Sequence, residues 1–370
     1  MRKGQNKIIG LTEQHGMAVE QRAFPPKGYE YKFLNYVTDG SLILRSPLKG
    51  FFSKFEDDRC DLLEAVLSPP NTRKPWVYSL ACFEEAIAFE LFGIPTPRWL
   101  RLKILNNFVL NDNCKALLFW SEAGLNTIYN YNFSERGRLL KKSYVVYPAI
   151  KIPECTVNYE KEENIQILFN GNFFIKGGAN VVDCFEILNS SFENIKLRLC
   201  CDRDSDFKVG DSELKHKYLR IIDKNPNITL GRVSREEFVN KILPETDIYL
   251  LPTYGDAFGF AVLEAMSYGI PVVSTNYMAI PEMVIHEESG YLADIKNYDC
   301  KKMFKGCFVN ELPDSFKDDL NKQILPYLRE LIKSSGLREK MGNSGRAICR
   351  RKFSFEKRSE RLDKIYRENL

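Results

Sequence analysis

The sequence predicts an α/β protein of two domains, the second of which contains a doubly wound parallel sheet. The chain has 370 residues, which suits two domains at about 100–200 residues each. Short apolar strands alternate with helical patterns through the second half, as in a parallel sheet covered by helices. The composition is 44% hydrophobic and 28% charged, which excludes disordered, collagen-like and coiled-coil chains.

The first half has a less regular pattern that still predicts an α/β domain. Its strands are expected at Lys7–Leu11, Leu42–Leu44, Trp76–Leu80, Ala116–Trp120 and Tyr144–Tyr147. Its helices are expected at Phe83–Phe92, Pro97–Asn111 and Glu122–Asn130. The stretch Pro148–Asn164 combines prolines with a run of Glu and Lys, so it is the expected linker.

In the second half, strands are expected at Ile165–Phe169, Ile195–Cys200, Ile228–Leu230, Asp247–Pro252 and Pro271–Ser274. Helices are expected at Gly178–Leu188, Ser212–Asp223, Ser234–Leu243 and Ala261–Tyr268. Ser234 and Glu237 have the spacing of a capping box, and Gly269 is placed to end the last of these helices. The tail Phe353–Leu370 is a charged helix whose spaced apolar residues predict one packed face.

Charge and cysteine usage exclude several classes of protein. A net charge of +4 does not predict a nucleic-acid partner. The ten cysteines include no C-x-x-C pair, so neither a zinc site nor a disulfide framework is expected. The basic N-terminus is interrupted at Thr12–Gln14, and no uncharged apolar run approaches the roughly 20 residues that span a bilayer. We therefore expect buried, reduced cysteines and a cytoplasmic location.

The segment Leu250–Val273 carries the densest chemical signal. It runs from a strand through a loop into a helix, where ligands of open α/β sheets bind. The backbone N–H groups of Phe258, Gly259 and Phe260, at the expected helix start, would form an anion site. Asp256 and Glu264 would lie roughly 10–12 Å apart along the axis. That span suits one carboxylate on a sugar and the other on a ribose; the alternative is two solvated acids.

A second segment, Phe169–Gly178, is also a strand, a glycine turn at Gly171 and a helix start. Here Lys176 would place a positive charge on a phosphate. The Gly177-Gly178 pair would admit close approach of the backbone. The alternative is a solvated lysine beside a turn.

Together, the two segments resemble the carboxyl-terminal domain of retaining glycosyltransferases with the GT-B fold, family GT4. That family has two acids separated by seven residues and then Ala-Met and Gly-x-Pro-Val-Val, which correspond here to Asp256, Glu264, Ala265-Met266 and Gly269–Val273. Further similar positions are Lys176-Gly177-Gly178, Gly231–Ser234, Pro281-Glu282, Ser289–Leu292, Trp120–Ala123 and Val145–Pro148. The resemblance covers residues 115–295 well and residues 1–114 poorly.

The sequence departs from the family pattern at three points. Asp256 stands where the family has its first Glu, which shortens the reach by one methylene. Asn172 stands where the family has a phosphate-binding Arg, so Lys176 is the only cation of that pair. A first-domain catalytic His is not evident. These departures leave the choice of donor open.

The resemblance implies two Rossmann-like domains facing a cleft, with residues 1–150 on the acceptor side and residues 151–350 binding the nucleotide sugar. Residues 351–370 would cross back to the first domain. Glu264 would hold the ribose and Arg232-Val233 the base. Lys176, with Gly171, Asn172 and the helix start at Phe258–Phe260, would hold the diphosphate, and Asp256 the sugar. No metal or other cofactor is implied.

On the acceptor side, His15 and Glu84 are candidates to face the cleft. The donor would be linked to UDP or GDP, and the acceptor would be a saccharide, a lipid-linked saccharide or another hydroxyl compound. Residues 98–105 mix basic and apolar side chains and could contact the inner face of a membrane; the alternative is an amphipathic helix of the first domain. The acidic run Asp202–Asp206 is interpreted as a solvated loop, with a metal site as the alternative.

Two other functions remain open. One is a non-hydrolysing UDP-sugar epimerase with the same fold. Such an enzyme would need a different set of acids and histidines, and the three histidines of this chain leave little room for that set. The other is an inactive transferase-like module that binds a nucleotide or a partner protein, an alternative that Asn172 and Asp256 keep open.

Overall fold

The computed structural model describes residues 6–13, 17–39, 52–56, 59–66, 68–87, 90–91, 94–95, 97–154, 156–157, 159, 164–209, 211–296 and 315–369. The chain divides into two compact units. Unit 1 is Met1–Lys151 with Lys352–Leu370, and unit 2 is Ile152–Arg351. Among the described residues, no helix is long and apolar enough to cross a bilayer.

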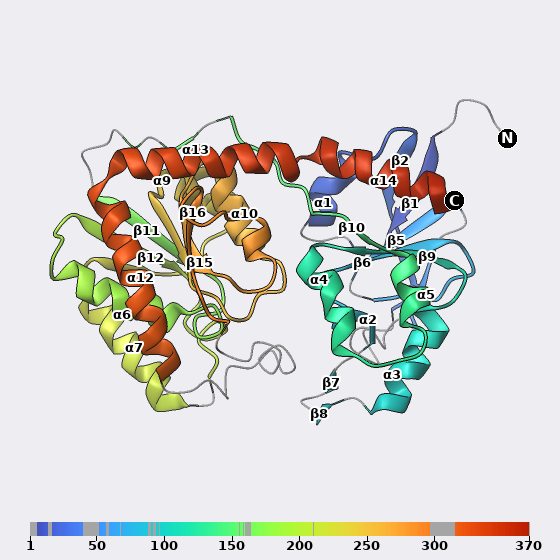
Figure 1. Ribbon diagram of the computed structural model, residues 1–370, viewed down its shortest axis with the longest axis horizontal. Helices are drawn as coiled ribbons and strands as arrows, with labels where there is room; N and C mark the ends of the chain where they lie inside the picture. The colour runs from blue at the N-terminus through green and yellow to red at the C-terminus, as the bar shows by residue number, and fades with distance from the viewer. Residues whose placement is uncertain are drawn as a thin grey trace. The chain divides into compact units, whose positions relative to one another are not determined.

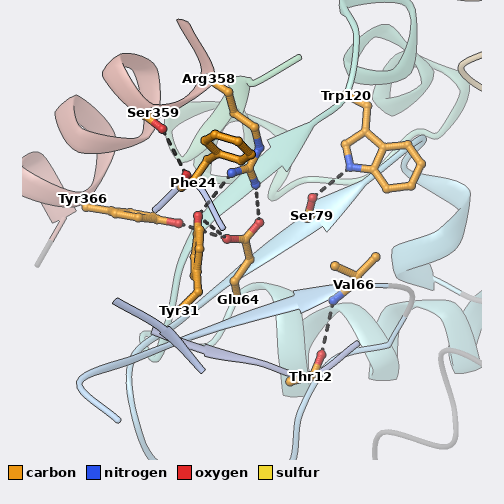
Figure 2. A network of polar contacts seen from close by, with 10 residues as sticks. All are labelled: Thr12, Phe24, Tyr31, Glu64, Val66, Ser79, Trp120, Arg358, Ser359 and Tyr366. Atoms are coloured by element: carbon orange, nitrogen blue, oxygen red, sulfur yellow. Dashed lines mark hydrogen bonds and ion pairs between the residues drawn. The ribbon is translucent and has the colours of Figure 1, made fainter. Parts of the chain in front are cut away.

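Unit 1 is built on six parallel strands in the order β10-β9-β6-β5-β1-β2 (Figure 1). The strands are β1 (Lys7–Leu11), β2 (Tyr29–Phe33), β5 (Leu62–Val66), β6 (Trp76–Leu80), β9 (Cys114–Phe119) and β10 (Ser143–Val145). The chain order changes direction between β1 and β5, which is the switch point of a doubly wound sheet. There the Thr12 hydroxyl accepts a hydrogen bond from the Val66 amide at 3.4 Å (Figure 2).

The helices of unit 1 are shorter than the sequence predicts. They are α1 (Met17–Arg22), α2 (Glu84–Ile87), α3 (Arg98–Ile104) with a π-helical turn Leu105–Val109, α4 (Glu122–Asn126) with a 3₁₀ turn Thr127–Asn130, and α5 (Arg136–Lys141). Two small antiparallel pairs join β3 (Tyr36–Thr38) to β4 (Lys54–Phe55) and β7 (Glu90–Leu91) to β8 (Ile94–Pro95). The helix expected at Phe83–Phe92 is therefore wrong in its second part, because β7 pairs with β8 instead. The strand expected at Leu42–Leu44 lies outside the described residues.

Unit 2 contains six parallel strands in the order β13-β12-β11-β14-β15-β16. Of these, β11, β12, β15 and β16 are labelled in Figure 1. The strands are β11 (Ile165–Asn170), β12 (Ile195–Cys200), β13 (Ile228–Leu230), β14 (Ile248–Leu251), β15 (Val272–Thr275) and β16 (Gly290–Ala293). The helices are α6 (Gly178–Asn189), α7 (Ser212–Lys224), α8 (Arg235–Glu237), α9 (Leu243–Glu245), α10 (Phe260–Ser267), α12 (Ser315–Lys333) and α13 (Ser335–Lys352), with a π-helical turn Phe238–Ile242 and a 3₁₀ turn Ile280–Glu282. The predicted α/β class with parallel sheets is confirmed.

The C-terminal helix α14 (Phe355–Asn369) is joined to the sheet of unit 1 by a buried charged network (Figure 2). Arg358 forms an ion pair with Glu64 of β5 at 2.8 Å, and the two side chains are only 5% and 1% exposed. The hydroxyl groups of Tyr31 and Tyr366 each donate to the second oxygen of Glu64 at 3.2 Å. Leu362 of the same helix is buried in the core of unit 1, as its spacing predicts.

Candidate functional site

The candidate site lies in unit 2 at the carboxyl ends of β11 and β14. These strands are neighbours in the sheet although β12 and β13 lie between them in the chain, so the strand order reverses there. Ligands of open α/β sheets bind at such a switch point. The two loops that leave these strands, residues 171–177 and 252–259, carry most of the residues that the sequence predicts.

Glycines allow the two loops to touch. Gly177 has φ +82°, and a Cβ placed on it would lie 2.3 Å from the carbonyl oxygen of Pro252. A Cβ on Gly255 would lie 2.1 Å from a side-chain methyl of Ile175. The Tyr254 hydroxyl donates to the carbonyl of Phe174 at 2.6 Å and ties the loops together. This packing places Lys176 of one loop beside Asp256 of the other.

Lys176 and Asp256 form an ion pair whose side chains are 23% and 14% exposed. Their interpretation as independently solvated side chains is therefore wrong. The second oxygen of Asp256 accepts a hydrogen bond from the amide of Gly259 at 3.0 Å. Gly259 is the N-cap of α10 with φ +96°. At the start of α10, the amide of Gly259 is thus bound by the carboxylate of Asp256 from its own loop, and the anion site at Phe258–Phe260 stays a prediction.

Glu264 lies on α10 and forms an ion pair with Arg235. Its side chain is 16% exposed, whereas that of Arg235 is 56% exposed. Arg235 is the first residue of α8, directly after the N-cap Ser234, whose hydroxyl accepts from the amide of Glu237 at 3.0 Å. The sequence predicts this cap but misses Arg235. A cation in the first turn of a helix interacts unfavourably with the helix dipole, and this unusual position was the sequence signal that Arg235 has an acidic partner elsewhere.

Tyr249 of β14 is a second residue that the sequence reasoning missed. Its buried hydroxyl donates to the side-chain oxygen of Asn170, the last residue of β11, at 2.5 Å. Burial raises the pKa of Tyr249 well above its ordinary value, and the charges of Glu264 and Asp256 raise it further. The phenol therefore stays neutral and connects β14 to the carboxyl end of β11.

Asn172 and Gly171 shape the first loop. The side-chain oxygen of Asn172 accepts from the amide of Ile175 at 3.3 Å, and its carbonyl accepts from the amide of Lys176 at 3.0 Å. Gly171 has φ +103°. Asn172 therefore closes the turn that carries Lys176, a role that a long arginine side chain would not fill in the same way.

The remaining predicted donor residues lie around the same edge of the sheet. Phe258 is buried, and its ring packs against that of Phe260 with centroids 4.8 Å apart. Arg232 follows β13 and is exposed, and Val233 is half-buried. Hydrogen bonds from Ser205 are the main cause that lowers the pKa of Asp202, and the charge of Arg232 adds to this effect. The structure thus groups Lys176, Asp256 and the α10 start, and it places Arg232 beside the Asp202 loop.

The Asp202–Asp206 run forms a turn closed by its own side chains. Asp202 accepts from the amide of Ser205 at 2.7 Å, and Arg203 forms an ion pair with Asp223. Within the described parts of the chain, no group of three or more His, Cys, Asp or Glu residues is arranged to hold a metal ion.

Of the two acceptor-side candidates, His15 lies outside the described residues. Glu84 belongs to unit 1, where it follows β6 at the carboxyl edge of the sheet. It is buried, and its carboxylate accepts from the side chain of Asn130 at 3.3 Å. Burial raises the pKa of Glu84, and it raises that of Glu85 to about 7. Glu85 accepts from the amide of Ala81 at 2.9 Å.

Residues 98–105 cover α3 and the first residue of the turn after it. Ile104 and Leu105 are buried in the core of unit 1, whereas Trp99 is 66% exposed. The guanidinium of Arg101 lies 5.5 Å from the ring centroid of Tyr131. The helix is amphipathic with its apolar face packed on unit 1, and an exposed tryptophan remains on the other face.

Comparison with known proteins adds to this geometry. Residues 164–305 match the family model "Glycosyl transferases group 1". The capsular polysaccharide biosynthesis glycosyltransferase CapM of Staphylococcus aureus is 26% identical over 295 residues, which are 74% of this chain and 69% of CapM. Among solved structures, sucrose-phosphate synthase from Thermosynechococcus elongatus has a TM-score of 0.67 at 12% identity and covers 98% of this chain and 99% of its own. Anabaena HepE in complex with UDP-glucose has a TM-score of 0.64 at 14% identity and covers 98% of this chain and 99% of its own.

Proposed function

We propose that this chain, a glycosyltransferase with the GT-B fold whose residues 164–305 match the group 1 family, transfers a sugar from a nucleotide-diphosphate sugar to a carbohydrate or lipid-linked acceptor. We propose further that it is of the GT4 type, retains the configuration of the anomeric carbon and needs no metal ion. The observation that carries the proposal is the pairing of Lys176 with Asp256 at the start of α10.

A diphosphate would compete with Asp256 for the same two partners. Asp256 presents a carboxylate both to the ammonium group of Lys176 and to the amide of Gly259. A donor diphosphate has the same charge-assisted hydrogen-bonding needs. As it takes over these contacts, the carboxylate of Asp256 is released to bind hydroxyl groups of the sugar.

The same contacts would then act on the bond that breaks. Negative charge grows on the diphosphate as the sugar departs. Lys176 and the amides at the α10 start are fixed before the reaction, so they stabilise this charge without reorganising. They would therefore supply the stabilisation that a metal ion supplies in other transferases.

Glu264 would hold the ribose hydroxyls, and the turn at Arg232-Val233 would hold the base. Glu264 is mostly buried and its charge is balanced by Arg235, so its carboxylate is fixed one to two turns along α10 from the diphosphate site. UDP is the first nucleotide to test, because HepE, which has a similar fold, was solved with UDP-glucose.

The acceptor is proposed to bind unit 1. By analogy with CapM, a saccharide used in capsular polysaccharide synthesis is the first acceptor class to test. We propose a cytoplasmic enzyme, with contact at the inner face of a membrane through the exposed Trp99 and the basic residues of α3.

Calorimetry with UDP and GDP, followed by assays of transfer and donor hydrolysis, tests the proposal. UDP should bind to the wild type, and activity should persist in EDTA. NMR of the product should show the anomeric configuration of the donor. If neither nucleotide binds, the assignment of the donor site is wrong; if one binds without turnover on a wide panel, the assigned reaction is wrong.

A further inference from the structure

Unit 1 contains a cavity of about 200 Å³ that plays no part in the site described above. It is lined by Leu110, Asp112, Cys114, Lys115, Arg138 and Lys142. Cys114 is the first residue of β9, and Lys142 directly precedes β10. The cavity therefore lies at the amino ends of these strands. Substrates of open α/β sheets bind at the opposite, carboxyl edge.

The lining carries three cations and one carboxylate. The ammonium group of Lys142 donates to the carbonyl of Cys114 at 2.8 Å and to that of Asn111 at 3.4 Å, which fixes it in the wall. Among the described residues, no hydrogen bond or ion pair involves the side chain of Lys115 or Arg138, and the charge of Arg138 acts on Glu135 outside the lining. The cavity thus has more positive charge than its own acid, Asp112, can balance.

The positive charges act on one another. Burial is the main cause that lowers the pKa of Lys142, and the neighbouring charges of Arg138 and Lys115 lower it further. The charges of Cys114 and Asp112 act in the opposite direction to those of the two cations, so burial is what keeps the pKa of Lys142 low. An anion between the three cations would relieve their repulsion.

We propose that this cavity binds a phosphate-bearing anion, held by the side chains of Lys115, Arg138 and Lys142. Since one water occupies about 30 Å³ in the liquid, the cavity has room for a group of several heavy atoms but is small for a whole nucleotide sugar. The planar guanidinium of Arg138 can bind two phosphate oxygens, and the two ammonium groups supply point charges. The phosphate could be free in solution or part of a lipid headgroup, and the experiment separates these sources.

The test uses the full chain and two probes. Binding of inorganic pyrophosphate is measured by calorimetry, and binding to vesicles is measured by sedimentation, with phosphatidylglycerol and phosphatidylcholine vesicles compared. The variant is the double substitution Lys115→Gln with Arg138→Gln, which removes two of the three cations of the lining. The control is Lys27→Gln with Lys141→Gln, which removes the same charge at exposed positions outside both the cavity and α3. The pyrophosphate titrations are carried out with saturating UDP, so that the proposed donor site is occupied in all three proteins.

The double variant should lose affinity for one probe by about tenfold or more, while the control keeps it within about twofold. A loss confined to pyrophosphate identifies a free anion, and a loss confined to phosphatidylglycerol vesicles identifies a headgroup. Equal binding of both probes to the double variant and the control, with unchanged circular dichroism, would overturn the proposal.

Discussion

Replacing Lys176 by methionine removes the cation that we propose to stabilise the leaving diphosphate, and it should lower kcat without unfolding the protein. The side chain of Lys176 is 23% exposed, so its interactions are only partly screened. At an effective dielectric constant of about 20, two unit charges about 4 Å apart interact by about 4 kcal/mol. Only part of a unit charge develops in the transition state, so about 2–4 kcal/mol is at stake, or about 30- to 1,000-fold in kcat.

The assay compares kcat and the donor KM of Lys176→Met with those of the wild type and of Lys208→Met, an exposed lysine of the same unit. Asp256 is mostly buried and loses its cation, so the free energy of unfolding should fall by about 1–3 kcal/mol. A kcat of Lys176→Met within about threefold of the wild type, in a folded protein, would refute the proposed role of this cation.

Three further predictions concern stability. Arg358→Met leaves Glu64 buried without its cation, so it should lower the free energy of unfolding in urea by about 3–5 kcal/mol. Adding Glu64→Gln should recover part of this loss. If it does not, the loss comes from the packing of α14 and not from the unpaired charge. In Gly177→Ala, the new Cβ would clash with the Pro252 carbonyl, and the left-handed φ would strain the backbone. The free energy of unfolding should therefore fall by about 1–3 kcal/mol or more, and UDP binding should weaken. Gly336→Ala, with open space around it, is the control. Burial raises the pKa of Glu85 to about 7, so the folded protein holds this proton more tightly than the unfolded chain does. The stability that this proton contributes is present at low pH and is lost as the pH rises from about 4.5 to 7, by about 3 kcal/mol. Glu85→Gln should flatten that part of the pH profile, and an unchanged profile would contradict the raised pKa.

The fold class of this protein could be predicted from sequence because unit 2 has strong local signals. Its strands are short apolar runs, and the cap at Ser234 and the glycines mark the turns between them. Unit 1 gave weaker signals, and β5 was missed. It carries Glu64 at its centre, and a glutamate in a sequence predicts a surface position rather than a buried strand. The residue that makes this burial possible, Arg358, lies 294 positions further along the chain, so no local pattern could reveal it.

The candidate site shows the same division between local and non-local information. Lys176, Asp256 and Glu264 follow from motif spacing, because each lies on a strand–loop–helix segment with its own turn residues. The ion pair between Lys176 and Asp256 does not follow from either segment alone. It depends on contact between two loops 80 residues apart, which the absence of a side chain at Gly177 and Gly255 permits.

Each acid of the motif already has a cation as its partner, and this changes how single substitutions must be interpreted. Asp256 is paired with Lys176, and Glu264 is paired with Arg235. If Glu264 binds the ribose, Glu264→Ala removes that contact but also releases Arg235, whose charge is then free to attract the diphosphate. The two effects on donor affinity have opposite signs, so a small net change would not show that Glu264 is dispensable. Only a double-mutant cycle with Arg235→Gln separates the ribose contact from the ion pair. If the loss caused by Glu264→Ala is larger in the Arg235→Gln background than in the wild type, the ribose contact is real.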